Sequence, residues 1–275
     1  MVDGGLMRVT TEQLDIMCDI AEVAGREIMA VYTGDFDEFT KDDASPLTEA
    51  DLRADRVIRT GLEKHFPGVF ILSEESVSAD PLPIAETFFL VDPLDGTKEF
   101  LKRNDEFTVN IALVHQGQPI AGVVLAPASK QLFFAVQDHG AWQRDGSGIT
   151  STLRVAQFHI GASLRVIGSR SHGGGGLSAW LDKLSHEHSF VSAGSSLKFC
   201  RIAAGEADIY PRFGPTSQWD TAAAQCVLEH AGGAVTNLAG RQLSYGLEKP
   251  LRNPEFIAVG DASLLSMLNL FATAR

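Results

Sequence analysis

Four apolar residues, Phe88 to Val91, lead directly into the segment Asp92-Pro93-Leu94-Asp95-Gly96-Thr97. The apolar run predicts a short buried strand. Pro93 has no backbone N–H and a fixed φ, so we expect the strand to end at Asp92 and the chain to leave the sheet there. The segment therefore predicts a sheet that carries acidic residues at the carboxyl end of one of its strands.

Asp92 and Asp95 are three positions apart on this sharp turn, so their carboxylates can converge on one point. Gly96 leaves room for a ligand, and Thr97 supplies a hydroxyl at the start of a predicted helix, where phosphate is favoured. Two such close carboxylates repel one another unless a cation or a proton lies between them, and Mg²⁺ prefers oxygen ligands. The same residues also suit a plain surface turn, because Asp, Pro and Gly are common in turns.

Helices and strands mix along the whole chain, which indicates a mixed α/β (α+β) protein built in layers. We expect a single catalytic unit, residues 1–275, made of two lobes: an α+β lobe over 1–160 with the metal site and an α/β lobe over 161–275 with the substrate-binding residues. The polar stretch 140–151 is interpreted as a turn region. The expected strands cover residues 69–72, 87–91, 107–115, 120–125, 132–136, 164–167, 190–191, 208–210 and 256–259. The expected helices cover residues 11–34, 48–66, 177–184, 194–202, 219–231 and 262–272.

The net charge of the chain restricts the classes of molecule that it can bind. Its 23 Lys and Arg against 35 Asp and Glu give a net charge of −12 over 275 residues. An acidic surface repels long polyanions, which excludes nucleic-acid polymers and anionic membranes as the main partner. A small anion remains possible if cations receive it. No apolar run is long enough to span a membrane, and no basic amphipathic helix supports peripheral attachment.

The chain has three widely spaced cysteines, Cys18, Cys200 and Cys226, and no CxxC pair. This spacing favours buried free thiols over a disulfide framework or a zinc site. It is typical of a protein in a reducing compartment, so we expect a cytoplasmic protein.

Three further acidic residues stand where an element begins or ends. Glu74 follows the expected strand 69–72, and Asp220 follows Trp219 at the start of a helix. Asp51 completes the capping-box pattern Thr48-Glu49-Ala50-Asp51. Each has an ordinary explanation when taken alone, as a solvated acid or as a helix cap. Together with Asp92 and Asp95 they indicate a cluster of carboxylates.

The segment from Asp92 to Thr97, together with Trp219-Asp220-Thr221-Ala222-Ala223, resembles the paired signature of the inositol monophosphatase superfamily. The resemblance extends from Ser45 to about Gly233, with the motifs in family order. It implies the layered αβαβα sandwich of the inositol monophosphatase and fructose-1,6-bisphosphatase type. It also implies a lithium-sensitive phosphomonoesterase that uses two or three Mg²⁺ ions.

Within that superfamily the sequence is most similar to the 3′(2′),5′-bisphosphate nucleotidases of the CysQ type. Inositol-type members usually carry Asn-Phe where this chain has Glu99-Phe100. They also carry an acidic sugar-binding residue at the position of Phe213, seven residues before Asp220. Both differences favour a nucleotide over an inositol phosphate as the substrate. The other matching segments are 45–48 with Asp51, 72–75, 98–100, 194–200 and 210–215.

The resemblance implies a role for each matching residue. Thr97 would orient the attacking water and Asp51 would draw off its proton, with Glu74 completing the catalytic set. The implied Mg²⁺ ligands are Glu74, Asp92, Asp95, Asp220 and the carbonyl of Leu94. The implied substrate-binding residues are Gly96, Thr97, His172, Ser195, Lys198 and Arg212, of which Lys198 and Arg212 would hold the phosphate that is not cleaved.

These roles imply a phosphoric monoester hydrolase of sulfur metabolism. It would remove the 3′-phosphate of adenosine 3′,5′-bisphosphate (PAP), or of its sulfated relative PAPS, and PAP would give AMP and phosphate. Two other interpretations stay open: an inositol-1-phosphate or fructose-1,6-bisphosphate phosphatase, and a non-catalytic regulator that binds Mg²⁺ and nucleotide. A monomer and a homodimer are both compatible with the sequence.

Overall fold

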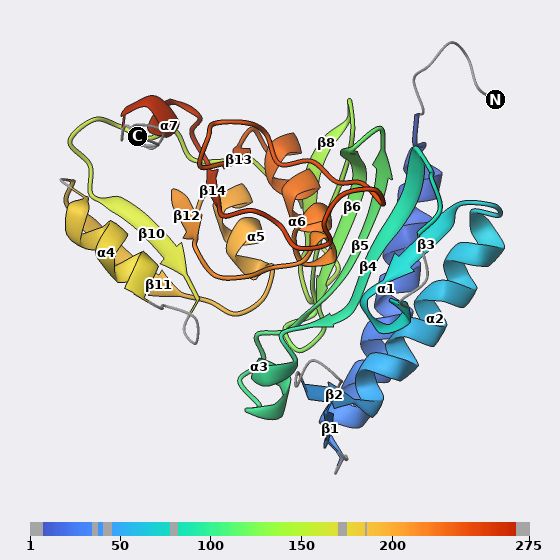
Figure 1. Ribbon diagram of the computed structural model, residues 1–275. Coiled ribbons are helices and arrows are strands. Elements are labelled where there is room, and N and C mark those ends of the chain that lie inside the picture. Colours follow the sequence, from blue (N-terminus) through green and yellow to red (C-terminus); the bar gives the residue numbers. More distant parts are fainter. Residues whose placement is uncertain are drawn as a thin grey trace.

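A seven-stranded sheet formed by the first half of the chain is the largest element of the fold (Figure 1). This computed structural model describes residues 8–34, 38–40, 46–77, 82–169, 175–184 and 186–267. Neighbouring strands of the sheet are antiparallel, except that the first two run parallel. In order across the sheet, the strands are β3 (Phe70–Ser73), β4 (Thr87–Asp95), β5 (Thr108–His115), β6 (Gln118–Ala126), β7 (Gln131–Val136), β8 (Gly140–Arg144) and β9 (Thr150–Thr152).

Strand β4 is buried on both faces, as its apolar run predicts. Successive side chains of a strand point to opposite faces of the sheet. Phe88 and Leu90 accordingly pack into one apolar core, and Phe89 and Val91 into another. Both faces of the sheet must therefore be covered by further layers.

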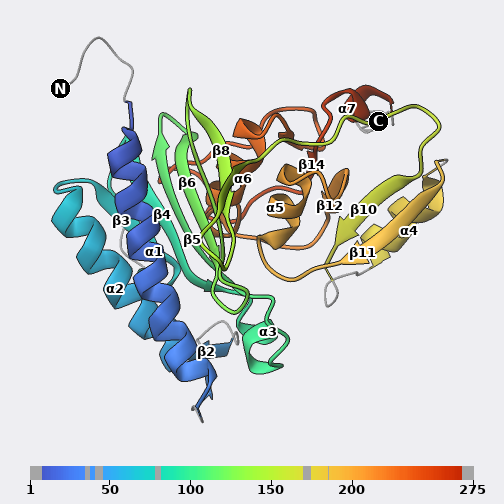
Figure 2. The same ribbon diagram turned by 180° about the vertical axis from the view of Figure 1, so that it is seen from behind.

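Two helices, α1 (Thr11–Tyr32) and α2 (Glu49–His65), cover one face of this sheet (Figure 2). Each begins with a capping box, made by Thr10 with Gln13 and by Thr48 with Asp51. The helices approach closely at Gly61, where a Cβ atom would lie 2.8 Å from Ile20. The short strands β1 (Glu38–Thr40) and β2 (Pro46–Thr48) pair with one another just before α2.

The opposite face of the large sheet packs against α5 (Leu197–Ala203) and α6 (Gln218–His230). The backbone of α6 lies so close to β6 that a Cβ atom at Gly122 would be 2.5 Å from the carbonyl oxygen of Ala223. Only glycine fits there, so Gly122 sets the depth at which α6 rests on the sheet. The helix that carries Asp220 is thereby fixed against the strands that carry the other acids.

A second sheet lies beyond α5 and α6, and the helices α4 (Gly175–Lys183) and α7 (Ser263–Met267) cover its outer side. The layer order is thus α1 and α2, large sheet, α5 and α6, small sheet, α4 and α7, which confirms the expected αβαβα sandwich. The short helix α3 (Thr97–Leu101) follows β4 at its carboxyl end. In order across the second sheet, the strands are β11 (His188–Ser192), β10 (Leu164–Gly168), β12 (Ile209–Arg212), β14 (Phe256–Val259) and β13 (Ala234–Asn237).

Two expectations about the first half of the chain are wrong. Strand β4 does not end at Asp92 but continues to Asp95, which pairs with Thr108 after a change of register. Pro93 is tolerated because this irregularity frees it from the regular ladder. The stretch 140–151 is not a turn region, since it holds β8, whose residues are mostly half-buried, and most of β9, whose residues are exposed and polar. The sequence interpretation also missed β13 and the β1–β2 pair.

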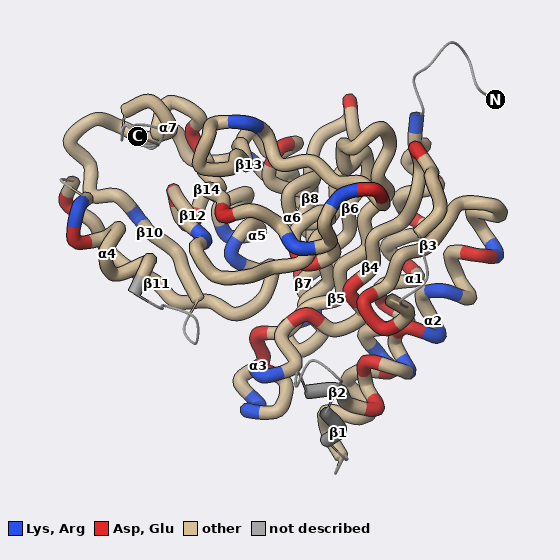
Figure 3. Tube along the Cα trace, in the orientation of Figure 1, with Lys and Arg blue, Asp and Glu red and all other residues tan. Residues whose placement is uncertain are grey.

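Charged residues are spread over the molecule, with acidic segments near the ends of β3 and β4 and around α3 (Figure 3). Within the described residues no helix combines the length and the apolar character that crossing a membrane requires.

Candidate active site

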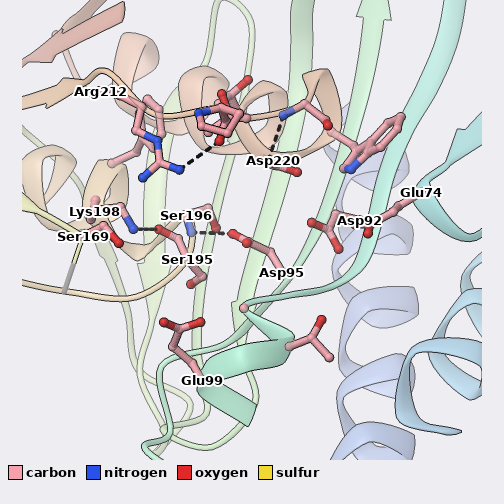
Figure 4. Close-up of a pocket in the computed structure, with 18 of the residues that line it drawn as sticks. Glu74, Asp92, Asp95, Glu99, Ser169, Ser195, Ser196, Lys198, Arg212 and Asp220 are labelled. Carbon is pink, nitrogen blue, oxygen red and sulfur yellow. Dashed lines mark hydrogen bonds between the residues drawn. The ribbon is translucent and has the colours of Figure 1, made fainter. Parts of the chain in front are cut away.

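Carboxylates from three separate elements converge at one end of the large sheet. Glu74 begins the short 3₁₀ helix η1 (Glu74–Ser76), Asp92 lies in β4, and Asp220 lies in the first turn of α6. One oxygen of each lies within 4.8 Å of the others, and Figure 4 shows the three side chains facing a common space. These are three of the four side chains that the sequence resemblance assigned to Mg²⁺.

The fold explains this convergence. Strands β3 and β4 are parallel neighbours and Ser73 pairs with Val91, so the next residue of each strand, Glu74 and Asp92, emerges at the same edge of the sheet. Asp220 arrives from the other side, because α6 packs on β4 and β5 with its amino-terminal end at that edge. Residues distant in sequence therefore meet because parallel strand ends and a helix start share one edge.

The donor set fits a hard divalent cation. Asp92 is buried, and its Oδ1 accepts a hydrogen bond from the Leu94 N–H at 3.0 Å. Its Oδ2 is also buried and has no hydrogen-bond partner among the described residues. Burial and then the neighbouring Glu74 carboxylate raise the pKa of Asp92 well above its usual range. Burial, followed by Asp95, does the same to the pKa of Asp220. A cation bound among these oxygens would remove the repulsion between carboxylates, which adds to the effect of burial on both pKa values.

Asp95 lies beside this group in the same pocket of about 280 Å³. Its Oδ2 accepts a hydrogen bond from the Ser196 N–H at 2.7 Å. Burial raises the pKa of Asp95 to about 6, against the opposing effect of the Lys198 ammonium. The carboxylate thus links the acidic end of the pocket to the loop that precedes α5.

Asp51 and Thr97 contact each other across the start of α2 and the start of α3. The Thr97 hydroxyl lies 3.4 Å from Asp51 Oδ1 and 3.3 Å from the Leu94 carbonyl oxygen. The other Asp51 oxygen accepts hydrogen bonds from the N–H of Thr48 at 2.8 Å and from its hydroxyl at 2.6 Å. Asp51 is therefore both a helix cap and a neighbour of Thr97. The helix-cap explanation is confirmed, whereas the role of Asp51 as proton acceptor stays a prediction.

The opposite end of the pocket carries positive charge. The Lys198 side chain is only 4% exposed, and its ammonium donates hydrogen bonds to the carbonyls of Ala193, at 3.2 Å, and Ser195. Burial lowers the pKa of Lys198 to about 8, against the opposing effect of Asp95. The Arg212 guanidinium lines the pocket and donates to the carbonyls of Gly214 and Pro215. Both cations are held in place by backbone carbonyls.

Two further predicted residues belong to this pocket. The Ser195 hydroxyl is buried and lacks a hydrogen-bond partner among the described residues. Gly96 has a φ of 92°, in the left-handed region that favours glycine, and a Cβ there would lie 3.1 Å from the Glu106 carbonyl oxygen. Gly96 therefore lets the chain turn tightly between β4 and α3. His172 lies outside the described residues.

Sequence reasoning missed Ser169 and Ser196, which line the pocket, and Asn110, which supports it. Asn110 is buried in β5, and its Oδ1 accepts a hydrogen bond from the Ser196 hydroxyl at 2.7 Å. That hydroxyl also lies 2.8 Å from the hydroxyl of Thr108. Two polar residues inside an otherwise apolar strand were the available signal, because buried polar groups need partners.

Comparison with known proteins supports this picture of the fold. The model of the "Inositol monophosphatase family" matches residues 10–267. The chain therefore belongs to the inositol monophosphatase family, whose enzymes are metal-dependent.

Within this family, the chain is similar to proteins curated as "3′(2′),5′-bisphosphate nucleotidase CysQ". It is 44% identical to the protein of Salmonella typhimurium and 45% identical to that of Escherichia coli K12. Each match spans 246 residues, 88% of this chain and 98% of the relative.

Solved structures agree with the family assignment. The crystal structure of CysQ from Bacteroides thetaiotaomicron superposes with a TM-score of 0.78 at 36% identity, over 90% of this chain and 97% of the other. An inositol monophosphatase of Thermotoga maritima superposes with a TM-score of 0.75 at 25% identity, over 95% and 97% of the two chains. The nucleotidase similarity is thus closer in sequence than the inositol phosphatase one.

Proposed function

We propose that this protein is a Mg²⁺-dependent phosphomonoesterase that removes the 3′-phosphate of PAP to give AMP and phosphate. The observation that carries the proposal is the distribution of charge in one pocket, which has several carboxylates at one end and the two cations Lys198 and Arg212 at the other. A bisphosphate needs both ends, one for the phosphate that reacts and one for the phosphate that stays. The names of the relatives at 44% and 45% identity support the nucleotide substrate.

Glu74, Asp92, Asp95, Asp220 and the Leu94 carbonyl would hold two or three Mg²⁺ ions. Bound there, the ions would supply charge neutralisation for the transferring phosphoryl group and its attacking and leaving oxygens. A water positioned by the Thr97 hydroxyl would attack phosphorus in line with the 3′-ester oxygen. Its proton would pass through the Thr97 hydroxyl to Asp51. The bond between phosphorus and the 3′-oxygen breaks as the new bond forms, and the 3′-oxygen takes up a proton from solvent to leave as the hydroxyl of AMP. The distance of 3.4 Å between Asp51 and Thr97 is long for a hydrogen bond, as is common before substrate tightens a site.

The second phosphate would lie against Arg212 and Lys198, with the Ser195 hydroxyl as a donor. Arg212 presents a planar fork suited to phosphate oxygens, whereas Lys198 acts as a compact charge. Because backbone carbonyls already hold both side chains, little conformational entropy is lost when substrate binds. His172 and Gly96 complete the proposed substrate contacts. A sugar monophosphate would offer these cations no second phosphate to bind.

The proposal extends to the form of the enzyme in the cell. We propose that the chain acts as one catalytic unit of two lobes, as a monomer or a homodimer. The lobe over 1–160 would supply most of the metal ligands, and the lobe over 161–275 would supply Asp220 and most of the substrate residues. Cys18, Cys200 and Cys226 are all buried and free, which supports the reducing cytoplasm as its compartment.

Phosphate release from PAP, PAPS, inositol-1-phosphate and fructose-1,6-bisphosphate tests the proposal, each measured with Mg²⁺, with EDTA and with added Li⁺. We expect Mg²⁺-dependent, lithium-inhibited release with the highest kcat/KM for PAP. Faster Mg²⁺-dependent turnover of a sugar phosphate would keep the metal site and refute the nucleotide assignment. Nucleotide binding without any phosphate release would instead favour a non-catalytic regulator.

A further inference from the structure

The start of α6 is held by a segment without regular structure, residues 245–253, which we call the clamp segment. Its backbone pairs with the residues that open the helix. The Gln218 N–H donates to the Leu251 carbonyl and the Asn253 N–H to the Thr216 carbonyl, each at 2.8 Å, and Ser217 forms an isolated bridge with Arg252. The first turn of α6 is therefore anchored to a second part of the chain.

Asn253 makes the densest set of side-chain contacts in this clamp. Its Nδ2 lies 2.6 Å from the Ser217 carbonyl oxygen, 2.9 Å from Thr221 Oγ1 and 3.2 Å from Thr216 Oγ1. These acceptors precede and follow Asp220 in the chain. One amide group thus joins the residues on both sides of the carboxylate.

The Thr221 hydroxyl connects Asn253 to further residues of α6 and of the clamp segment. It accepts from Asn253 and donates to the Gln218 carbonyl at 3.3 Å, and the Tyr245 hydroxyl lies 3.0 Å away. The Gln218 side chain donates to the carbonyls of Gly246 and Pro250, each at 3.0 Å, and accepts from the Gly246 N–H. These groups are mostly buried, so each lost partner would leave a polar atom without a hydrogen bond.

The position of Asp220 depends on these contacts because Asp220 is hydrogen-bonded to Ser217, the N-cap of α6. Asp220 Oδ2 accepts a hydrogen bond from the Ser217 N–H at 2.9 Å, and Figure 4 shows this contact with the Asp220 side chain facing the pocket. The Ser217 carbonyl that Asn253 grips belongs to the same residue. A shift of Ser217 therefore turns the Asp220 carboxylate relative to Glu74 and Asp92.

We propose that Asn253 is a positioning residue for the metal site, which orients Asp220 by gripping Ser217 and Thr221. The inference rests on the proposed function only in taking Asp220 as a cation ligand. Outer groups that orient metal ligands typically change metal affinity about 10- to 100-fold when they are removed. Asn253→Ala should therefore weaken cation binding by about 10- to 100-fold and leave the other contacts of the pocket in place.

The test measures Mn²⁺ binding to the metal-free protein by calorimetry, the Mg²⁺ dependence of phosphate release, and the melting temperature. The variants are Asn253→Ala and the isosteric Thr221→Val, which removes one acceptor of the clamp and serves if Asn253→Ala fails to fold. Asn237→Ala is the matched control, because Asn237 Oδ1 accepts hydrogen bonds from the N–H groups of the nearby Ala239 and Arg241. Asp220→Asn tests the assumption about the ligand.

We expect weaker Mn²⁺ binding and a raised Mg²⁺ requirement for both clamp variants, with kcat recovering at high Mg²⁺ and no change for the control. A lower melting temperature with unchanged Mn²⁺ affinity would show a merely structural role and overturn the inference. A low kcat that excess Mg²⁺ does not restore would overturn it as well. If Asp220→Asn leaves Mn²⁺ binding unchanged, the failure lies in the ligand assignment of the proposed function.

Discussion

The substitution Asp51→Asn separates the two contacts that Asp51 makes. In the native site one oxygen caps α2 through the Thr48 N–H and hydroxyl, and the other lies 3.4 Å from the Thr97 hydroxyl. Asparagine keeps one oxygen, which can still accept from Thr48. Its amide nitrogen then faces Thr97 and carries protons, so it cannot accept another. The helix cap survives while the proposed proton acceptor is lost.

Positioned general bases contribute about 10²- to 10⁴-fold to a rate. We therefore expect kcat to fall by that factor, which corresponds to about 3 to 5 kcal/mol of the activation barrier. Asp51 is not one of the three acids within 4.8 Å of one another, so the affinity for Mn²⁺ should change little. The melting temperature should also stay close to that of the native protein, because the cap remains.

The assay is single-substrate kinetics with PAP at saturating Mg²⁺, accompanied by Mn²⁺ calorimetry and thermal melting. Thr97→Val, which removes the hydroxyl at nearly constant volume, should lose turnover to a similar extent, and Thr97→Ser should retain most of it. Turnover of Asp51→Asn within about threefold of the native value would refute the assignment of the general base, since that lies far below the expected loss. Weakened metal binding would show that Asp51 acts through the metal site instead.

Three further outcomes follow from burial and charge. At 4.8 Å, two like charges repel by about 3 kcal/mol at an effective dielectric constant near 20, so Asp92→Asn should raise the melting temperature in EDTA and abolish its increase with Mg²⁺. Burial raises the pKa of Glu229 from 4.5 to about 7. The folded state then binds this proton more tightly than the unfolded state, so the free energy of unfolding falls as pH rises from 4.5 to 7. Urea melts at pH 5 and pH 8 should show that Glu229→Gln removes up to about 3 kcal/mol of this loss. Asn110→Ala should cost about 0.5 to 1.5 kcal/mol of folding free energy, measured in the same melts, because it removes one of the two hydrogen-bond partners of the buried Ser196 hydroxyl and leaves only Thr108.

Local patterns predicted much of the fold correctly. The first helix was expected from residue 11, where α1 begins. The capping box at Thr48 placed the start of α2, because its signal lies within four residues. The β5–β6 hairpin was found from two apolar runs around Gln116-Gly117. The stretch 140–151 was interpreted wrongly because β8 is only half-buried and β9 is exposed, so their polar side chains resemble those of a turn.

The acids of the site could be predicted because each one ends a strand or begins a helix. The sequence could not show which residues hold these acids in place through hydrogen bonds. Ser196 and Asn110 are 86 positions apart, and Asn253 lies 36 positions from Ser217. Such contacts depend on how the layers pack, and no local periodicity records them.

The site concentrates negative charge that the protein itself does not neutralise. Four carboxylates, on η1, β4 and α6, are directed into one pocket, and burial raises the pKa of Asp92, Asp95 and Asp220. The buried cation of the pocket, Lys198, lies at the other end and already gives two of its three N–H donors to backbone carbonyls. Its charge lowers the pKa of Asp95 without removing the effect of burial. The acidic end is therefore held in an arrangement that costs folding free energy until a divalent cation binds, and supports such as Asn110 and Asn253 keep that arrangement in place.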